Sequence, residues 1–140
     1  VQAVQFGYVR VLLQFAQPFQ QGIIYTVKVN GIKDCAGNPI GINDSARFAL
    51  PDTISREDIV INEILFNPKT SGVDYMELYN RSQKVFDVSK LVMEEREVAE
   101  PSKILEVSDT LAEPLLMFPQ DYLVFTSNPA VVLAQYNVKQ

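Results

Sequence analysis

The sequence predicts an all-β fold with one short helix near its C-terminal end, and two observations support this prediction. Short runs rich in β-branched and aromatic residues recur along the chain, and several of them alternate between apolar and polar side chains. Clusters of Pro, Gly, Asn and Asp separate these runs, as is typical of turns. With 140 residues, of which 47% are apolar, the chain is long enough to bury a core.

Three strands are predicted in the first half of the chain. Residues 8–16 are rich in apolar and β-branched side chains. Within residues 23–32, alternation places Tyr25 and Val27 on one face and polar side chains on the other. Such a pattern is typical of a half-buried strand in an antiparallel sheet. Residues 46–50 predict one more short strand.

The second half follows residues 51–58, which are polar, contain a proline and predict a linker between two domains. Residues 59–66 and 74–80 are the clearest strand segments, and we expect them to pair as a hairpin. Four glutamates and a proline predict an exposed loop at residues 94–102. Residues 121–126 predict another strand.

A short helix is predicted near the end of the chain. Asn128 suits the N-cap position and Pro129 suits the first helical position, so residues 130–136 can follow as helix. Before this helix, the spacing of apolar residues indicates one or two short strands within residues 85–93 and another at residues 104–107.

The composition excludes several classes of function. There is no histidine, so a Ser-His-Asp triad, a Cys-His pair and a His-ligated metal are absent. The single cysteine, Cys35, excludes an intrachain disulfide and a thiolate metal cluster. A net charge of −5 argues against a nucleic-acid surface, and no apolar run reaches the roughly 18–20 residues of a membrane span. We therefore expect a chain that is not an enzyme, binds no nucleic acid and does not span a membrane.

Four short motifs follow one another in the second half of the chain. The first is Asn62-Glu63 inside a strand, and the second is Asn67-Pro68 in the next loop. The third is the end of the following strand, from Glu77 to Asn80, and the fourth is a Val-Phe-Asp-Val-Ser turn at residues 85–89. With this order and spacing, residues 58–138 resemble the lamin tail domain. The strand at residues 118–125, which is entered from a proline, and the helix after it continue the resemblance.

The resemblance implies an immunoglobulin-like β-sandwich for residues 59–140, with the motif residues in structural roles. These residues are Asn62, Glu63, Asn67, Pro68, Glu77 and Asn80. The family's Gly-Trp after the turn is replaced here by Lys90-Leu91, and its last strands are expected beyond Gln140. A sandwich without those strands has open strand edges, so a homodimer through these edges is an expected form of self-association.

The first half carries a second set of motifs. They are a Tyr-Thr-Val-Lys-Val strand at residues 25–29, an Asp-Cys-Ala-Gly-Asn-Pro turn at residues 34–39, and Phe48 in the strand that follows. Residues 8–50 thereby resemble the closing strands of bacterial immunoglobulin-like domains, so residues 1–50 are expected to be part of such a domain. The start at Val1, without a signal peptide, predicts a piece of a longer chain.

Together the two resemblances imply a large exported protein of Bacteroidetes-type bacteria, located in the periplasm, at the cell surface or outside the cell. The expected function is a non-catalytic structural or interaction module whose partners are neighbouring domains of the same polypeptide, or a surface protein or glycan. Two alternatives stay open. One is a carbohydrate- or protein-binding module. The other is an accessory domain of an exported nuclease or phosphoesterase whose catalytic part lies outside this chain.

Several residues have both a structural and a chemical interpretation. Glu63 and Glu77 lie on strands expected to pair, which suits acid–base chemistry, but the favoured role is structural, with each carboxylate bonding turn backbone, an arginine or a lysine. Asn62 alternates with apolar neighbours, so we expect it to point inward and to hold the Asn67-Pro68 loop. Tyr75 and Tyr79 share a strand face with Glu77, and this face is a candidate binding surface.

A Ca²⁺ site is a further alternative, although no cofactor is expected as the default. Four residues offer oxygen ligands in turns: Asp34, Asn38, Asp44 and Asp52. Their spacing differs from that of an EF-hand loop, which favours solvated turns instead. Cys35 has Lys33 close by, but an inert thiol is the favoured interpretation.

Overall fold

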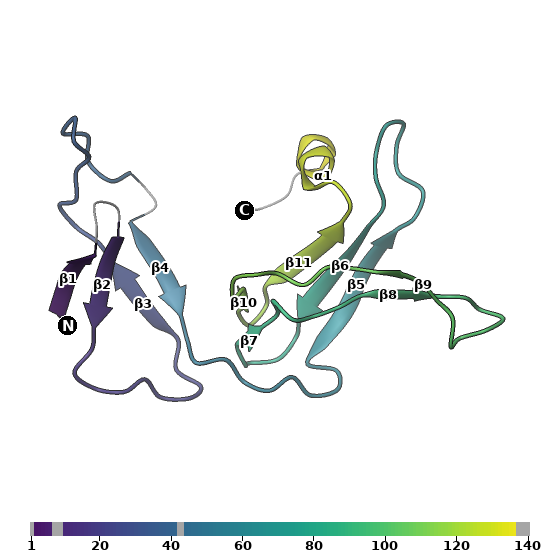
Figure 1. Cartoon of the computed structure of the whole chain (residues 1–140), viewed down its shortest axis with the longest axis horizontal. Coiled ribbons are helices and arrows are strands. Elements are labelled where there is room, and N and C mark those ends of the chain that lie inside the picture. The colour runs from purple at the N-terminus through teal and green to yellow at the C-terminus, as the bar shows by residue number, and fades with distance from the viewer. Residues whose placement is uncertain (1, 7–9, 42–43, 137–140) are drawn as a thin grey trace. The chain divides into compact units, whose positions relative to one another are not determined.

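The computed structural model describes residues 2–6, 10–41 and 44–136. The chain divides into two compact units, which we call unit 1 (Val1–Leu50) and unit 2 (Pro51–Gln140). Every strand pair in the described part is antiparallel, and one short helix accompanies the strands (Figure 1). The chain is therefore all-β, as the sequence predicts.

Unit 1 is built from two separate antiparallel ladders. Their strands are β1 (Gln2–Phe6) with β2 (Arg10–Gln14), and β3 (Tyr25–Lys28) with β4 (Ser45–Phe48). Strand β2 falls inside the strand expected at residues 8–16, of which residues 8 and 9 lie outside the described part. Four aromatic rings cluster beside the β3–β4 ladder with centroid separations of 4.8 to 6.0 Å. They belong to Phe15, Phe19, Tyr25 and Phe48.

Unit 2 contains a three-stranded sheet in the order β11–β6–β5 and two short ladders. The strands of the sheet are β5 (Ile59–Leu65), β6 (Tyr75–Asn80) and β11 (Tyr122–Thr126). The ladders are β7 (Phe86–Asp87) with β10 (Leu116–Met117), and β8 (Glu94–Arg96) with β9 (Ile104–Val107). Strands β5 and β6 pair antiparallel, which confirms the expected hairpin.

The core of unit 2 lies against one face of its three-stranded sheet. Alternation along β6 puts Met76 and Leu78 on this face, and the register pairs them with Phe125 and Leu123 of β11. The buried members of the cluster are Leu78, Phe86, Val88 and Met117. Phe86 has an exposed fraction of 0%, so the short β7 strand supplies the most deeply buried ring.

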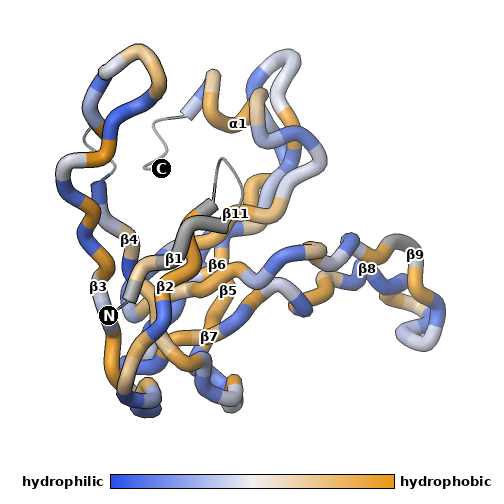
Figure 2. The backbone as a smooth tube through the Cα atoms, turned by 60° about the vertical axis from the view of Figure 1, so that its left-hand side comes forward, coloured by the Kyte–Doolittle hydropathy of each residue, from blue (hydrophilic) through white to orange (hydrophobic). Residues whose placement is uncertain are grey.

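Strand β8 lies where the sequence predicts an exposed loop at residues 94–102, so this prediction is wrong for residues 94–96. The charge pattern indicated exposure, and these three residues are indeed exposed. Exposure does not prevent pairing, because β8 obtains its backbone partners from β9. Two contacts close the base of this hairpin: Met93 N donates to Ser108 Oγ, and Ser108 N donates to the Met93 carbonyl, both at 2.9 Å. Figures 1 and 2 show the turn of the hairpin extending beyond the sheet.

Helix α1 (Pro129–Gln135) follows β11 and confirms the predicted helix. The Asn128 side chain accepts a hydrogen bond from Val131 N at 3.3 Å, which satisfies one of the free N–H groups of the first turn. Val132 is the buried residue of this helix. Within the described residues, no helix combines the length and apolar character needed to cross a membrane.

Candidate functional site

Two glutamates face each other across the β5–β6 hairpin. The register pairs Glu63 directly with Glu77, and a β-bulge between Ile61 and Glu63 places Asn62 beside this pair. Like charges in directly opposed positions destabilise a sheet unless other groups compensate. The local sequence thus creates an electrostatic cost that the neighbouring polar side chains must offset.

Each of these carboxylates accepts a hydrogen bond from a different neighbour. Asn62 Nδ2 donates to Glu77 Oε1 at 2.7 Å, and the Tyr75 hydroxyl donates to Glu63 Oε1 at 2.6 Å. The hydrogen bond to the Glu63 carboxylate, together with burial and the negative charge of Glu63, raises the pKa of Tyr75 to about 12. Both glutamates bond side chains of their own hairpin, and not the turn backbone, arginine or lysine expected as their partners.

Asn62 does not point inward, contrary to the prediction from alternation. Its side chain is exposed and bonds Glu77 rather than the Asn67-Pro68 loop. The physical reason is the β-bulge, which inserts an extra residue and breaks the two-residue period on which the prediction depended.

The loop that contains Asn67 and Pro68 lies against the C-terminal helix instead. A Cβ atom on Gly72 would lie 2.7 Å from Pro68 Cβ and 2.9 Å from Gln135 Oε1, so only glycine fits there without rearrangement. The rings of Tyr75 and Tyr136 also meet edge to face, with centroids 5.6 Å apart. Close approach to α1 therefore positions this loop.

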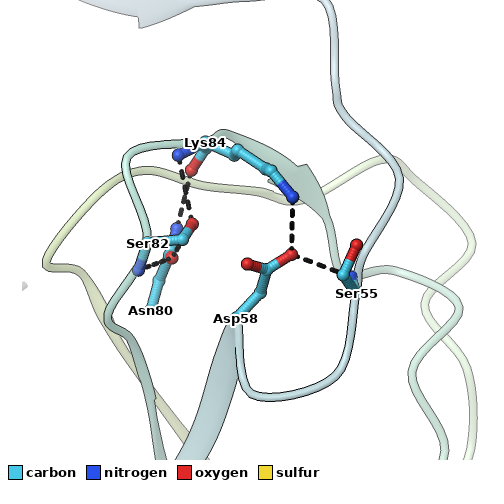
Figure 3. Close-up of polar contacts among 5 residues, drawn as sticks. All are labelled: Ser55, Asp58, Asn80, Ser82 and Lys84. Carbon is cyan, nitrogen blue, oxygen red and sulfur yellow. Dashed lines mark hydrogen bonds and ion pairs between the residues drawn. The ribbon is translucent and has the colours of Figure 1, made fainter.

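Asn80 makes the most extensive polar contacts of the motif residues. Its exposed fraction is 0%. Its Nδ2 group donates to the Lys84 carbonyl at 2.8 Å and to the carbonyls of Phe118 and Met117 at 3.0 and 3.3 Å. Its Oδ1 atom accepts from Ser82 N and Ser82 Oγ (Figure 3). One side chain thus joins the end of β6 to the segment after β10.

A second polar group lies next to Asn80 and involves residues that the sequence analysis did not select. Lys84 Nζ contacts Asp58 Oδ2 at 2.9 Å, and the same oxygen accepts from Ser55 N at 2.8 Å (Figure 3). The hydrogen bonds from Lys84 and Ser55 hold the pKa of Asp58 below its usual value. The spacing of Ser55 and Asp58, three residues apart, was the available signal, because aspartate side chains often bond nearby backbone N–H groups.

The turn at residues 85–89 is held in the same way. Asp87 Oδ1 accepts from Ser89 N at 3.0 Å and from Leu115 N at 3.2 Å. The hydrogen bonds from Ser89 lower the pKa of Asp87. Because Leu115 lies far along the sequence, this carboxylate connects the turn to the segment before β10.

The tyrosines of the candidate binding surface form two separate pairs. Tyr75 contacts Tyr136, whereas Tyr79 lies opposite Tyr122 with ring centroids 4.8 Å apart and planes inclined by 30°. The exposed fraction of Tyr122 is 57%. Only the β6–β11 register shows that Tyr122 is the cross-strand neighbour of Tyr79.

The predicted oxygen ligands have other contacts. Asp34 accepts hydrogen bonds from Ala36 N and from both Asn38 N and Asn38 Nδ2, which closes a local turn and lowers its pKa. Asp44 forms an ion pair with Lys28 at 3.3 Å. Within the described residues, no three His, Cys, Asp or Glu side chains are grouped so as to hold a metal ion. Cys35 is exposed.

The fold and these contacts define the class of the protein as an all-β chain with antiparallel sheets. Comparison with protein-family models, with curated proteins and with solved structures finds no match to the chain.

Proposed function

We propose that the chain is a non-catalytic structural module of an exported bacterial protein, and that unit 2 is an immunoglobulin-like sandwich of the lamin tail type. The observation that carries this proposal is the Asn80 network. A buried amide that bonds three carbonyls from two separate segments serves to position backbone. Such a module positions neighbouring domains of its polypeptide in the periplasm, at the cell surface or outside the cell.

The layering of unit 2 is consistent with a sandwich. One face of the β11–β6–β5 sheet packs on a core to which the β7–β10 ladder contributes Phe86 and Met117. Two layers of strands around one apolar core define sandwich architecture. The carboxylates of Glu63 and Glu77 bond their own hairpin, which supports a scaffold role for the motif.

A melting-temperature screen tests this proposal. The chain is heated with Ca²⁺, with EDTA, with a panel of glycans and with duplex DNA. A ligand that binds only the folded state raises the melting temperature in a dose-dependent way. We expect a cooperative transition that none of these additions moves. A dose-dependent rise with any one of them would reject a purely structural role and would identify the class of ligand.

A glycan-binding module is the second candidate, and the Tyr79–Tyr122 pair favours it. The two rings lie close together with moderately inclined planes on the sheet face opposite Leu78 and Leu123, and Tyr122 is well exposed. Aromatic faces of this kind can stack on the apolar face of a sugar ring. If a glycan raises the melting temperature, Tyr122→Ala should abolish the rise and Tyr122→Phe should preserve it. Equal effects of the two substitutions would reject stacking.

A further inference from the structure

Unit 2 contains an open groove of about 900 Å³ beside its core. One side is the core face of the sheet, where Ile64, Met76 and Phe125 contribute apolar side chains. The other side is formed by the base of the β8–β9 hairpin and by Leu111 and Leu115. Ile64, Leu111 and Leu115 are exposed, so the groove presents apolar surface to its opening.

Backbone contacts fix the second side of the groove. Leu111 N donates to the Ser89 carbonyl at 2.9 Å, and Leu115 N donates to Asp87 Oδ1 at 3.2 Å. Val88 N donates to the Leu115 carbonyl at 2.9 Å. Because both leucines are anchored to the buried turn, the groove is largely preformed, as is usual for binding sites.

The charged side chains that line the groove are all acidic, and two cations lie beside it: Arg96, and Lys90, whose Nζ donates to the Leu111 carbonyl at 3.3 Å. Four carboxylates line it, and none of the described residues that line it is basic. Glu94 has Arg96 as an ion-pair partner. The side chains of Asp74, Glu95 and Asp109 have no such partner in the described part of the chain. Unit 2 as a whole holds fifteen of the 17 acidic residues and eight of the 12 basic ones.

We propose that this groove binds an extended peptide segment in which apolar residues alternate with lysine or arginine. In an extended segment, alternate side chains point to opposite sides. The apolar side chains of the peptide can then face the aliphatic side chains of the groove, while its basic side chains face the carboxylates that line the groove. Strands β5 and β11 are the edges of their sheet, and β8 pairs only with β9, so open strand edges in the described part border the groove. An extended peptide can add to such an edge.

A second copy of the chain fits less well than a basic segment. The net charge of the chain is −5, and the excess of carboxylates lies in unit 2. Placing unit 2 of another copy over the groove would bring together two surfaces with an excess of negative charge. A basic, apolar peptide instead supplies the opposite charge and covers the exposed aliphatic side chains.

Peptide binding to the complete chain tests the proposal. The probe is a fluorescent, end-capped peptide of about eight residues, long enough to form a strand, with alternating valine and lysine. Two control peptides replace lysine by glutamate or valine by serine. We expect a saturable rise in anisotropy for the valine–lysine peptide alone, weakened several-fold as NaCl rises from about 0.05 to 0.5 M. Equal binding of the valine–glutamate peptide would overturn the proposal.

Matched variants locate the site. Ile61 and Ile64 are similarly exposed on the core side of β5, but only Ile64 lines the groove. Ile64→Ser should therefore weaken binding, whereas Ile61→Ser should not. Likewise, Glu95→Gln with Asp109→Asn should weaken binding about fivefold. Glu100→Gln with Glu113→Gln removes the same charge outside the groove and should have little effect on peptide binding.

Three outcomes contradict the proposal. The first is equal behaviour within either pair of variants, and the second is the absence of saturable binding. The third is a dimer, detected by light scattering, that the Ile64→Ser substitution dissociates, because a second copy would then occupy the groove.

The proposed peptide binding goes beyond the proposed structural function and can be tested separately from it. A glycan that raises the melting temperature would reject the structural role alone, whereas failure of the peptide to bind would reject only the groove assignment.

Discussion

The two units of this chain are both antiparallel β structures, yet they differ in how much they bury. Unit 2 surrounds Phe86 completely and places Val88 and Met117 in the same cluster. Among the described side chains of unit 1, none is fully buried, and its apolar contacts are mainly the four clustered rings. Two-stranded ladders have too little surface to enclose a core by themselves. A three-stranded sheet packed against further ladders provides that surface.

One strongly hydrogen-bonded side chain in each unit shows a difference in the same direction. In unit 1, Asp34 bonds residues no more than four positions away. In unit 2, Asn80 bonds carbonyls 37 and 38 positions away. Local contacts stabilise a turn, whereas distant contacts make separate segments fold together. We therefore expect unit 2 to unfold cooperatively and unit 1 to open more readily.

The largest effect is expected at the centre of the unit 2 core. Phe86→Ala removes a ring that is fully enclosed, and we expect a loss of about 3–5 kcal/mol in the free energy of unfolding. Urea unfolding followed by circular dichroism measures this loss. Phe66→Ala is the control, because its side chain is 82% exposed and its removal should cost less than about 0.5 kcal/mol. Similar costs at both positions would contradict the assigned core.

The next largest effect is expected for the buried amide. Asn80→Ala leaves interior carbonyls without their donor, and we expect a loss of about 2–3 kcal/mol. Hydrogen exchange should show reduced protection at residues 80–84 and at residues 115–121 together. Asn62→Ala, which removes an exposed amide, should cost less than about 1 kcal/mol. Reduced protection at residues 80–84 alone would show that Asn80 does not connect the two segments.

A smaller effect is expected in unit 1. Phe48→Ala removes one of four contacting rings, and the side chain is only half-buried, so we expect a local loss of about 1–2 kcal/mol. Hydrogen exchange should accelerate at residues 10–28 and remain unchanged in unit 2. An equal acceleration in unit 2 would mean that the two units are energetically coupled.

The smallest effect concerns the exposed hydrogen bond in the β5–β6 hairpin. Glu63→Gln removes the carboxylate whose hydrogen bond and negative charge raise the pKa of Tyr75, so this pKa should fall from about 12 toward the ordinary value of 10.0. Phenolate absorbance, with Tyr75→Phe as the reference, measures the shift. The folded pKa is raised, so the contact stabilises fully below pH 10.0 and is lost as pH rises through about 12. An unchanged titration would show that the Tyr75–Glu63 contact does not form in solution.

Most of the regular elements were predictable because their signals are local. Alternation in residues 23–32 and 74–80 indicated β3 and β6, and the apolar run at residues 59–66 indicated β5. Asn128 with Pro129 marked the start of α1. The prediction was wrong at β8, because clustered charge indicates exposure and says little about pairing. It was also wrong for Asn62, because a bulge changes which side chains share a face.

The motif around Asn80 shows where prediction from sequence ends. The sequence indicated that Asn80 is structural, but its partners at residues 117 and 118 depend on how distant segments pack. The same holds for Tyr122, whose pairing with Tyr79 requires the β6–β11 register. The groove beside Ile64 was not predictable at all, because its two sides come from segments far apart in the chain.

By itself, the sequence determined the all-β class, the main strands, the helix and its cap, and the absence of histidine chemistry. These properties follow from composition, two-residue alternation and capping, which act between neighbours in the chain. Only the tertiary structure decided which glutamate bonds which neighbour, what the buried amide connects, and where an acidic, apolar groove opens. Such contacts depend on strand register and on packing between distant segments, and a single sequence does not specify either of these locally.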